Sequence, residues 1–348
     1  MKLAKNVYNY DNHQLLVGAG TVLTDETISR LAYYSIIDVH IDETYQPEPA
    51  AEEETADNSY VERLRQTPQF KKFKADFEDN ADRFEKRINQ VVKKNGDLHV
   101  DTLVDPVLKM VDETGNPSSV FDMLHALRSY DDLTYMHSIN VSLICNVMGQ
   151  WLKFPEEEVR VLTAAGLLHD IGKILVPGDL IAKPSRLTKH EYAIVQRHAY
   201  EGYMVLKDLD INDHIKNAAL MHHERMDGSG YPLHLKGEQI DPYAKIVAIA
   251  DVYDAMTSPR VYRGALCPFV AIALFEKEGL QKYETQYILT FLECIVNTYL
   301  LNRVKLSNGM EGEIVFINRD VLSKPTIKVG DAYVDLTQYP DITIEKII

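Results

Sequence analysis

Cysteine is scarce in this chain of 348 residues, which contains Cys145, Cys267 and Cys294. They lie far apart and form no Cys-x-x-Cys pair, so the sequence predicts neither a disulfide framework nor a zinc site built from thiolates. Long apolar runs are missing too, because no stretch approaches the roughly 18 uninterrupted apolar residues of a membrane-spanning helix. The first residues, MKLAKNVYNYDNHQ, lack the apolar run of a signal peptide. We therefore expect a cytoplasmic protein without a membrane span.

Positive charge is also in short supply. The chain has 37 Lys and Arg against 52 Asp and Glu, which gives a formal net charge of −15. General binding to DNA or RNA uses clustered Lys and Arg against phosphate, so we do not expect a nucleic-acid polymer as a partner. The fractions of hydrophobic (45%) and charged residues (26%) are typical of a globular protein, and disorder is not the expectation.

The chain divides into parts that differ in pattern. A short apolar run, a glycine-rich turn and a helix start at Thr24 open the chain, and the next stretch, PEPAAEEETADNS, is too acidic and too poor in large apolar groups to order itself. Helical periodicity follows, and the end of the chain has short, alternating, β-branched segments between turns. The expected fold class is mainly α, an all-α core with a small N-terminal α+β module and a small C-terminal β unit. The predicted parts are an accessory module (1–45), a linker (46–59), a helical connector (60–125), a catalytic domain (126–300) and the β unit (301–348).

One apolar stripe dominates the connector. Its side chains recur at three- and four-residue steps on a helix otherwise covered with Lys, Asp and Glu, and the stripe must pack against something. It either joins the protein's own core or pairs with a second copy of the helix, so a homodimer through the connector stays open. The stripe consists of Phe70, Phe73, Phe77, Phe84, Ile88 and Val91, with a gap at Ala81.

Residues of metal-ligand type lie on or beside the apolar faces of five separate predicted helices. One inward-facing histidine is ordinarily a core residue with satisfied hydrogen bonds, but burying this many imidazoles and carboxylates without partners would cost several kcal/mol. Neutral imidazole and carboxylate are good ligands for divalent ions, so a metal centre resolves the problem. The candidates are His137, His169, Asp170, His198, His222, His223 and Asp251.

Adjacent His169 and Asp170 suggest a shared site, because a carboxylate has two oxygens and can bridge two ions. Two ions about 3.5–4 Å apart can hold a hydroxide and stabilise displacement at phosphorus. Lys173 lies three residues after Asp170, and Arg260 and Arg263 follow the Asp251 helix. Guanidinium groups suit phosphate oxygens, although without the histidines these three cations would be interpreted as solvated surface charges.

Three segments carry a family resemblance. HDIGKILVP at 169–177, HHERMDGSGYP at 222–232 and ADVYDAMTSPRVYR at 250–263 closely resemble the HD-GYP family of cyclic di-GMP phosphodiesterases, which are HD superfamily metal-dependent phosphohydrolases. The resemblance covers roughly residues 130–270. It implies that His137, His169, Asp170 and Asp251 hold one metal, and that Asp170 bridges to a second metal held by His198, His222 and His223. Which ion takes His223 stays open.

The resemblance also implies roles for other residues. Lys173, Arg260 and Arg263 match positions that contact substrate phosphates, with Asp170 and Lys173 as the catalytic pair. Tyr231 belongs to the name-giving Gly-Tyr-Pro loop, which takes part in substrate access or in contacts with a protein partner. Family members with three metals have a Glu where this chain has Leu133, so we expect two divalent transition-metal ions, iron or manganese before others.

The expected function is hydrolysis of cyclic di-GMP to linear pGpG, with further cleavage to GMP open, by attack of a hydroxide that bridges the two metals. Two alternatives stay open. The same chemistry can act on another cyclic dinucleotide or a nucleotide phosphate, because the ligands indicate a phosphoester and not a base. The chain can also be a metal-bound sensor of cyclic dinucleotides with little turnover.

Overall fold

The structure is a computed structural model, and it describes residues 2–8, 15–23, 27, 31, 36, 39–42, 60–94, 98–127, 134–181, 183, 187–259 and 265–348. Several predicted features lie outside these residues: most of the first helix, the linker at 46–59, Leu133, Arg260 and Arg263.

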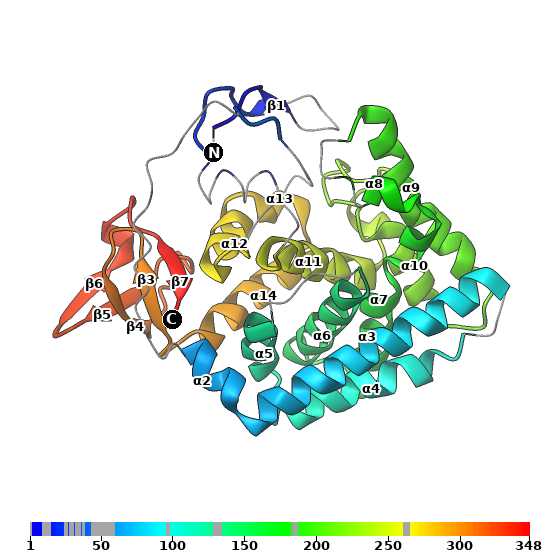
Figure 1. Ribbon diagram of the computed structural model, residues 1–348, viewed down its shortest axis with the longest axis horizontal. Coiled ribbons are helices and arrows are strands. Elements are labelled where there is room, and N and C mark those ends of the chain that lie inside the picture. Colours follow the sequence, from blue (N-terminus) through cyan, green and yellow to red (C-terminus); the bar gives the residue numbers. More distant parts are fainter. Residues whose placement is uncertain are drawn as a thin grey trace.

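The described part of the chain is mainly helical, with a small sheet at each end of the sequence, and the expected fold class is confirmed (Figure 1). None of the helices described here is long and apolar enough to cross a membrane. The α-helices are α2 (Tyr60–Gln66), α3 (Pro68–Lys94), α4 (Val100–Glu113), α5 (Ser119–Leu127), α6 (Thr134–Trp151), α7 (Glu156–Leu168), α8 (Gly178–Ile181), α9 (Lys189–Leu206), α10 (Asp213–Met221), α11 (Pro242–Thr257), α12 (Pro268–Leu274), α13 (Leu280–Lys282) and α14 (Thr285–Thr298).

The apolar stripe of α3 is buried inside the chain. All seven of its positions, including Ala81, are at most 5% exposed and belong to the same hydrophobic core as the helices around the centre. Figure 1 shows α3 running alongside α4, and α3 also contacts α6. Of the two arrangements left open by the sequence, the structure therefore has the first, in which the stripe packs on the protein's own core.

The C-terminal segment forms a five-stranded antiparallel sheet in the order β6-β5-β4-β3-β7. Its inward side chains, such as Val304 and Ile327, join the same core as the helices. Glu276 in the π-helical turn η3 (Phe275–Gly279) accepts hydrogen bonds from the backbone of Leu322 and Ser323. The strands are β3 (Arg303–Leu306), β4 (Glu311–Phe316), β5 (Thr326–Val329), β6 (Ala332–Asp335) and β7 (Ile344–Ile347).

The N-terminal residues pair β1 (Val7–Tyr8) with β2 (Leu15–Val17) in antiparallel orientation. They have a small hydrophobic cluster of their own, which includes Leu3, Leu16 and Ile36. The short apolar run predicted near the start of this module forms β2, and the predicted helix lies almost wholly outside the described residues.

Two glycines allow the helices that carry the candidate ligands to approach closely. A Cβ on Gly172, in the short helix η1 (Ile171–Leu175), would lie 2.0 Å from the carbonyl oxygen of His198 in α9. A Cβ on Gly166 in α7 would lie 2.9 Å from Sγ of Cys145 in α6. Both distances are too short for a side chain, so glycine at these positions brings α6, α7 and α9 together around one point.

Local signals place the other two helices. Thr188 and Glu191 form the predicted capping box at the start of α9, and both of its hydrogen bonds are present. The Asp241 side chain accepts from the backbone N–H of Tyr243 and so caps α11, with Pro242 at its first position as predicted.

Candidate metal centre

All seven candidate ligands meet inside the helical body. His137 comes from α6, His169 and Asp170 from the end of α7, and His198 from α9, while His222 and His223 end α10 and Asp251 lies on α11. Six of them are buried, and His223 is largely buried. Their donor atoms form two groups in which all atoms lie within 4.8 Å of one another. One group is Asp170, His198, His222 and His223; the other is His137, His169 and Asp251.

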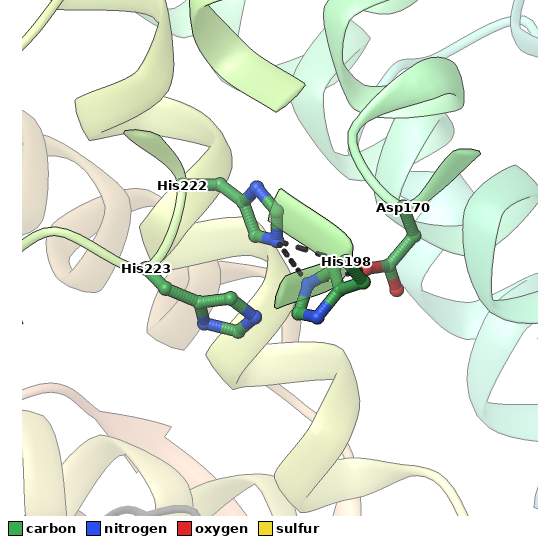
Figure 2. A group of neighbouring side chains, drawn as sticks. All are labelled: Asp170, His198, His222 and His223. Atoms are coloured by element: carbon green, nitrogen blue, oxygen red, sulfur yellow. Dashed lines mark hydrogen bonds and ion pairs between the residues drawn. The ribbon is translucent and has the colours of Figure 1, made fainter. Parts of the chain in front are cut away.

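The first group surrounds one oxygen of Asp170. Oδ1 lies 3.3 Å from Nε2 of His198 and 3.6 Å from Nε2 of His222. Figure 2 shows Asp170 on one side of His198, with His222 and His223 on the other. The structure thus groups His223 with His198 and His222, a question that the sequence left open.

The second group faces the other oxygen of Asp170. Oδ2 lies 3.2 Å from Nε2 of His169 and 3.6 Å from Nε2 of His137. Asp251 completes this group, with Oδ1 at 3.1 Å from Nε2 of His137 and 3.9 Å from Nε2 of His169. The two oxygens of Asp170 are therefore divided between the two groups, which is the arrangement that a bridging carboxylate requires.

Hydrogen bonds on the outer side of the rings fix which nitrogen faces inward. Nδ1 of His169 donates to the carbonyl of Gly166 at 2.7 Å, and Nδ1 of His198 donates to that of Val195 at 2.7 Å. Nδ1 of His222 lies 3.0 Å from the carbonyl oxygen of Ala218. Because a carbonyl only accepts, each Nδ1 carries the proton and each Nε2 presents a lone pair to the interior.

The donor set fits divalent ions. Nε2 of His198 and Nε2 of His222 face one another at 3.3 Å, so two lone pairs are opposed in a buried space. Nε2 of His169, Oδ1 of Asp170 and Nδ1 of His223 are buried without a hydrogen-bond partner among the described residues. Such groups are costly in a protein interior, and a cation between them removes the cost. Imidazole with carboxylate is a ligand set for transition-metal ions.

Most of these groups have the protonation state that metal binding requires. Burial lowers the pKa of His198 to about 3, and it also lowers the pKa values of His222 and His223. Burial alone would raise the pKa of Asp170, but Lys173 and His169 outweigh it and hold that pKa well below its usual range. The imidazoles are therefore neutral and the carboxylate is ionised.

His137 is different. Burial disfavours its charged form, but hydrogen bonds with Asp251 and Asp254 outweigh burial and raise its pKa to about 10. Burial is likewise outweighed at Asp251, where His137 holds the pKa well below its usual range. Without an ion, a proton therefore lies between His137 and Asp251, in the position that a cation would take.

Asp254 is a further residue of the site that was not predicted from the sequence. This residue is buried on α11, and its Oδ2 lies 2.7 Å from Nδ1 of His137, while its Oδ1 accepts from the hydroxyl of Ser258 at 2.9 Å. A carboxylate behind a metal-binding histidine is a common way to orient the ring. The available signal was spacing, because Asp254 follows Asp251 by three residues and shares its helix face.

Two predicted substrate contacts lie beside the centre. Nζ of Lys173 contacts Oδ2 of Asp170. The ring of Tyr231 stacks on His223, with 4.5 Å between ring centroids, and burial raises the pKa of its phenol well above the usual range, so the phenol is neutral. Arg260 and Arg263 lie outside the described residues, and their predicted contacts stay predictions.

Known proteins are similar to this chain in sequence or in fold. Residues 122–286 match the family described as HD domain. The cyclic di-GMP phosphodiesterase PA4108 of Pseudomonas aeruginosa is 34% identical over 233 residues, which are 66% of this chain and 55% of that protein. The 3'3'-cGAMP-specific phosphodiesterase 1 of Vibrio cholerae is 37% identical over 144 residues, 41% of this chain and 33% of that protein. The chain thus spans about half of the first relative and a third of the second.

A solved structure shows the same fold. Bd1817, an HDG"Y"P protein from Bdellovibrio bacteriovorus, superposes with a TM-score of 0.53 at 17% identity, covering 84% of this chain and 94% of that one. At this identity the likeness shows the fold, and the match to the HD domain family covers residues 122–286 of the chain. The predicted resemblance to cyclic di-GMP phosphodiesterases is borne out by relatives that carry this name.

Proposed function

We propose that this chain is a metal-dependent phosphodiesterase that hydrolyses cyclic di-GMP to linear pGpG and, in a second cleavage, to GMP. One observation carries the proposal: the two oxygens of Asp170 face two separate groups of donor atoms, which suits two ions that share a ligand. Binuclear sites of this kind serve hydrolysis of phosphoesters. Relatives that are 34% and 37% identical over the matched residues are named as phosphodiesterases of cyclic di-GMP and of 3'3'-cGAMP.

The cofactors proposed are two divalent transition-metal ions, iron or manganese. His137, His169 and Asp251 would hold one, and His198, His222 and His223 the other, with Asp170 between them. When bound, such ions supply positive charge to a phosphate oxygen and lower the pKa of bound water.

The chain's own residues bind and orient the substrate. Nζ of Lys173 contacts Asp170, and a quarter of the Lys173 side chain is exposed, so the ammonium group can reach a phosphate oxygen next to the centre. Arg260 and Arg263 would hold phosphate oxygens further out. Tyr231 covers His223 with a neutral ring, which limits the access of water to that side and offers a flat face to a base.

The choice of base is the open part of this proposal. A relative that is 37% identical over 144 residues is named as specific for 3'3'-cGAMP, and metal ligands indicate a phosphoester rather than a base. A protein partner at the Gly-Tyr-Pro loop also stays a prediction, as do the cytoplasmic location and the predicted division into five parts. A homodimer through α3 would have to use the polar face of this helix, because its apolar stripe is buried in the chain.

Chromatography of the products tests the function. The protein is purified without air, loaded with iron or manganese and incubated with cyclic di-GMP, 3'3'-cGAMP and cyclic di-AMP. We expect cyclic di-GMP to disappear fastest, with pGpG formed before GMP. Faster loss of another dinucleotide would identify that dinucleotide as the substrate and leave the proposed reaction unchanged. Tight binding of cyclic di-GMP without products, by a chain carrying two ions, would favour the sensor instead.

A further inference from the structure

His223 is oriented differently from the other four histidines of the centre. Each of the others has its Nδ1 fixed by a hydrogen bond, to a backbone carbonyl or, for His137, to Asp254. Nδ1 of His223 is buried and has no such partner among the described residues. Apart from other ligands of the centre, the ring packs on Tyr231, whose plane is inclined by 26° to it. The nearest carboxylate oxygen to this Nδ1, Oδ2 of Asp251, lies 3.9 Å away, beyond hydrogen-bond distance. Stacking on Tyr231 therefore helps to set how His223 points.

Tyr231 lies on a loop that is fixed to the chain just after His223. The backbone N–H of Tyr231 donates to the carbonyl oxygen of His223 at 3.2 Å. A Cβ on Gly230 would lie 2.4 Å from that same oxygen and 2.5 Å from the amide nitrogen of Arg225, so the loop passes too close for any side chain there. The loop and the histidine are thus in direct contact through their backbones.

Glu224 anchors the far end of this loop. Glu224 is buried, with 2% of the residue exposed. Oε1 accepts from the backbone N–H of Leu233 at 2.6 Å, and Oε2 accepts from that of Leu235 at 2.9 Å. Hydrogen bonds from amides to an ionised carboxylate are stronger than neutral ones, and here both oxygens are used. The carboxylate joins the residue after His223 to the segment just beyond Tyr231.

We propose that Glu224 is a positioning residue of the metal centre: by holding Leu233 and Leu235 it keeps the Tyr231 ring against His223, and so aims the His223 imidazole at its ion. This inference rests on the proposed function. It predicts a selective effect on the ion that uses His223, because Tyr231 stacks on His223, while the rings of His137 and His169 are held by hydrogen bonds outside the loop.

The substitution Glu224→Gln tests this assignment. The amide keeps one acceptor and presents N–H groups to the second backbone donor, so one of the two anchoring bonds is lost. Glu238→Gln is the matched control, since Glu238 is an exposed glutamate at the end of the same loop. Both variants and the wild type are loaded with Mn²⁺ without air, and the ions retained per chain are counted across a series of chelator concentrations.

We expect Glu224→Gln to bind one of its two ions about 10- to 100-fold more weakly, as is usual when an outer contact of a metal ligand is lost. The other ion should be retained as in the wild type, and Glu238→Gln should match the wild type for both. Amide hydrogen exchange in residues 226–237 should be faster in Glu224→Gln alone. Wild-type affinity for both ions, or equal weakening of both, would overturn the inference.

A second variant keeps the test independent of how Glu224→Gln folds. Tyr231→Leu leaves the carboxylate in place and removes the ring, and it should weaken the same single ion. The double variant should bind this ion no more weakly than the weaker-binding single variant, because both substitutions act through one contact. A loss of affinity in the double variant equal to the product of the two single losses would contradict the assignment. A wild-type chain that binds no ion would overturn both this inference and the proposed function, whereas two ions in every variant would overturn the inference alone.

Discussion

Nδ1 of His137 lies 2.7 Å from the carboxylate of Asp254, while Nε2 of the same ring lies 3.1 Å from Asp251. The ring is thus held from behind by one carboxylate and faces another inside the candidate metal centre. Both carboxylates come from α11, so this one helix supplies a candidate ligand and the group that orients a second candidate ligand.

The first prediction concerns Asp254. Asp254→Asn keeps an acceptor for His137 but removes the negative charge that favours a strongly basic Nε2, so affinity for the ion held by His137 should fall about 10- to 100-fold. Metal titration with a competing chelator measures this. Asp213→Asn, at an exposed position on α10, should leave both affinities unchanged. An Asp254→Asn chain with unchanged affinities would remove Asp254 from the centre.

The second prediction concerns the close approach of η1 and α9. Gly172→Ala places a methyl group against the His198 carbonyl and the Gly202 backbone, so the free energy of unfolding should fall by about 2–3 kcal/mol or more. Because Asp170 and His198 flank this contact, metal content should fall too. Urea denaturation with metal analysis measures both. Gly178→Ala is the control, as nothing lies within 4 Å of its Cβ position. Equal stability of both variants would show that the helices can separate freely.

The third prediction concerns pH. Burial raises the pKa of Asp122 to about 6 despite a hydrogen bond from the Tyr60 hydroxyl. The folded chain therefore holds this proton up to a higher pH than the unfolded chain, whose Asp titrates near 4. The contribution of Asp122 to the free energy of unfolding is fully present below about pH 4. It is lost as the pH rises to about 6, by up to about 3 kcal/mol.

Asp122→Asn removes this titration and can still accept from Tyr60. The variant should be more stable than the wild type at pH 7, and the difference should vanish toward pH 4. Denaturation midpoints measured at intervals from pH 4 to 7 check this, with the exposed Asp208→Asn as the control. A difference that stays constant over this range would contradict the assigned pKa.

The fourth prediction separates a core stripe from a dimer contact. Phe77 is 3% exposed in the chain's own core, so Phe77→Ala should lower the free energy of unfolding by about 3–5 kcal/mol. The loss should be the same at low and high protein concentration, since no subunit contact is involved. Lys71→Ala, on the exposed face of α3, should change little. A loss that depends on concentration would instead place the stripe between two copies.

The helices and the candidate ligands that meet in the structure could be predicted from the sequence, because both leave local signals. Three- and four-residue spacing put the α3 stripe on one face and placed His169 and Asp251 in line with apolar neighbours. What covers the stripe was not predictable, because the spacing along one helix says nothing about α4 or α6. The division of the Asp170 oxygens between two groups could not be predicted from the sequence either, since it depends on how α7 and α9 meet at Gly172.

Asp254 and Glu224 show two further limits. The position of Asp254, three residues after Asp251, was a usable signal, but a single acidic residue on a helix is ordinarily a surface charge. Glu224 lies in a loop without periodicity, and its partners are the backbone amides of Leu233 and Leu235, nine and eleven residues away. Backbone donors have no signature in a sequence.

The central claim is that Asp170 joins two ions in one centre, and a count of metals in an Asp170→Asn variant tests it most directly. The wild type, prepared without air and loaded with iron or manganese, should carry two ions per chain and hydrolyse cyclic di-GMP. Asp170→Asn should lose affinity for both ions together, and with it all hydrolysis, because each group of donors loses its shared carboxylate. An Asp170→Asn chain that keeps two tightly bound ions and full activity would contradict the account.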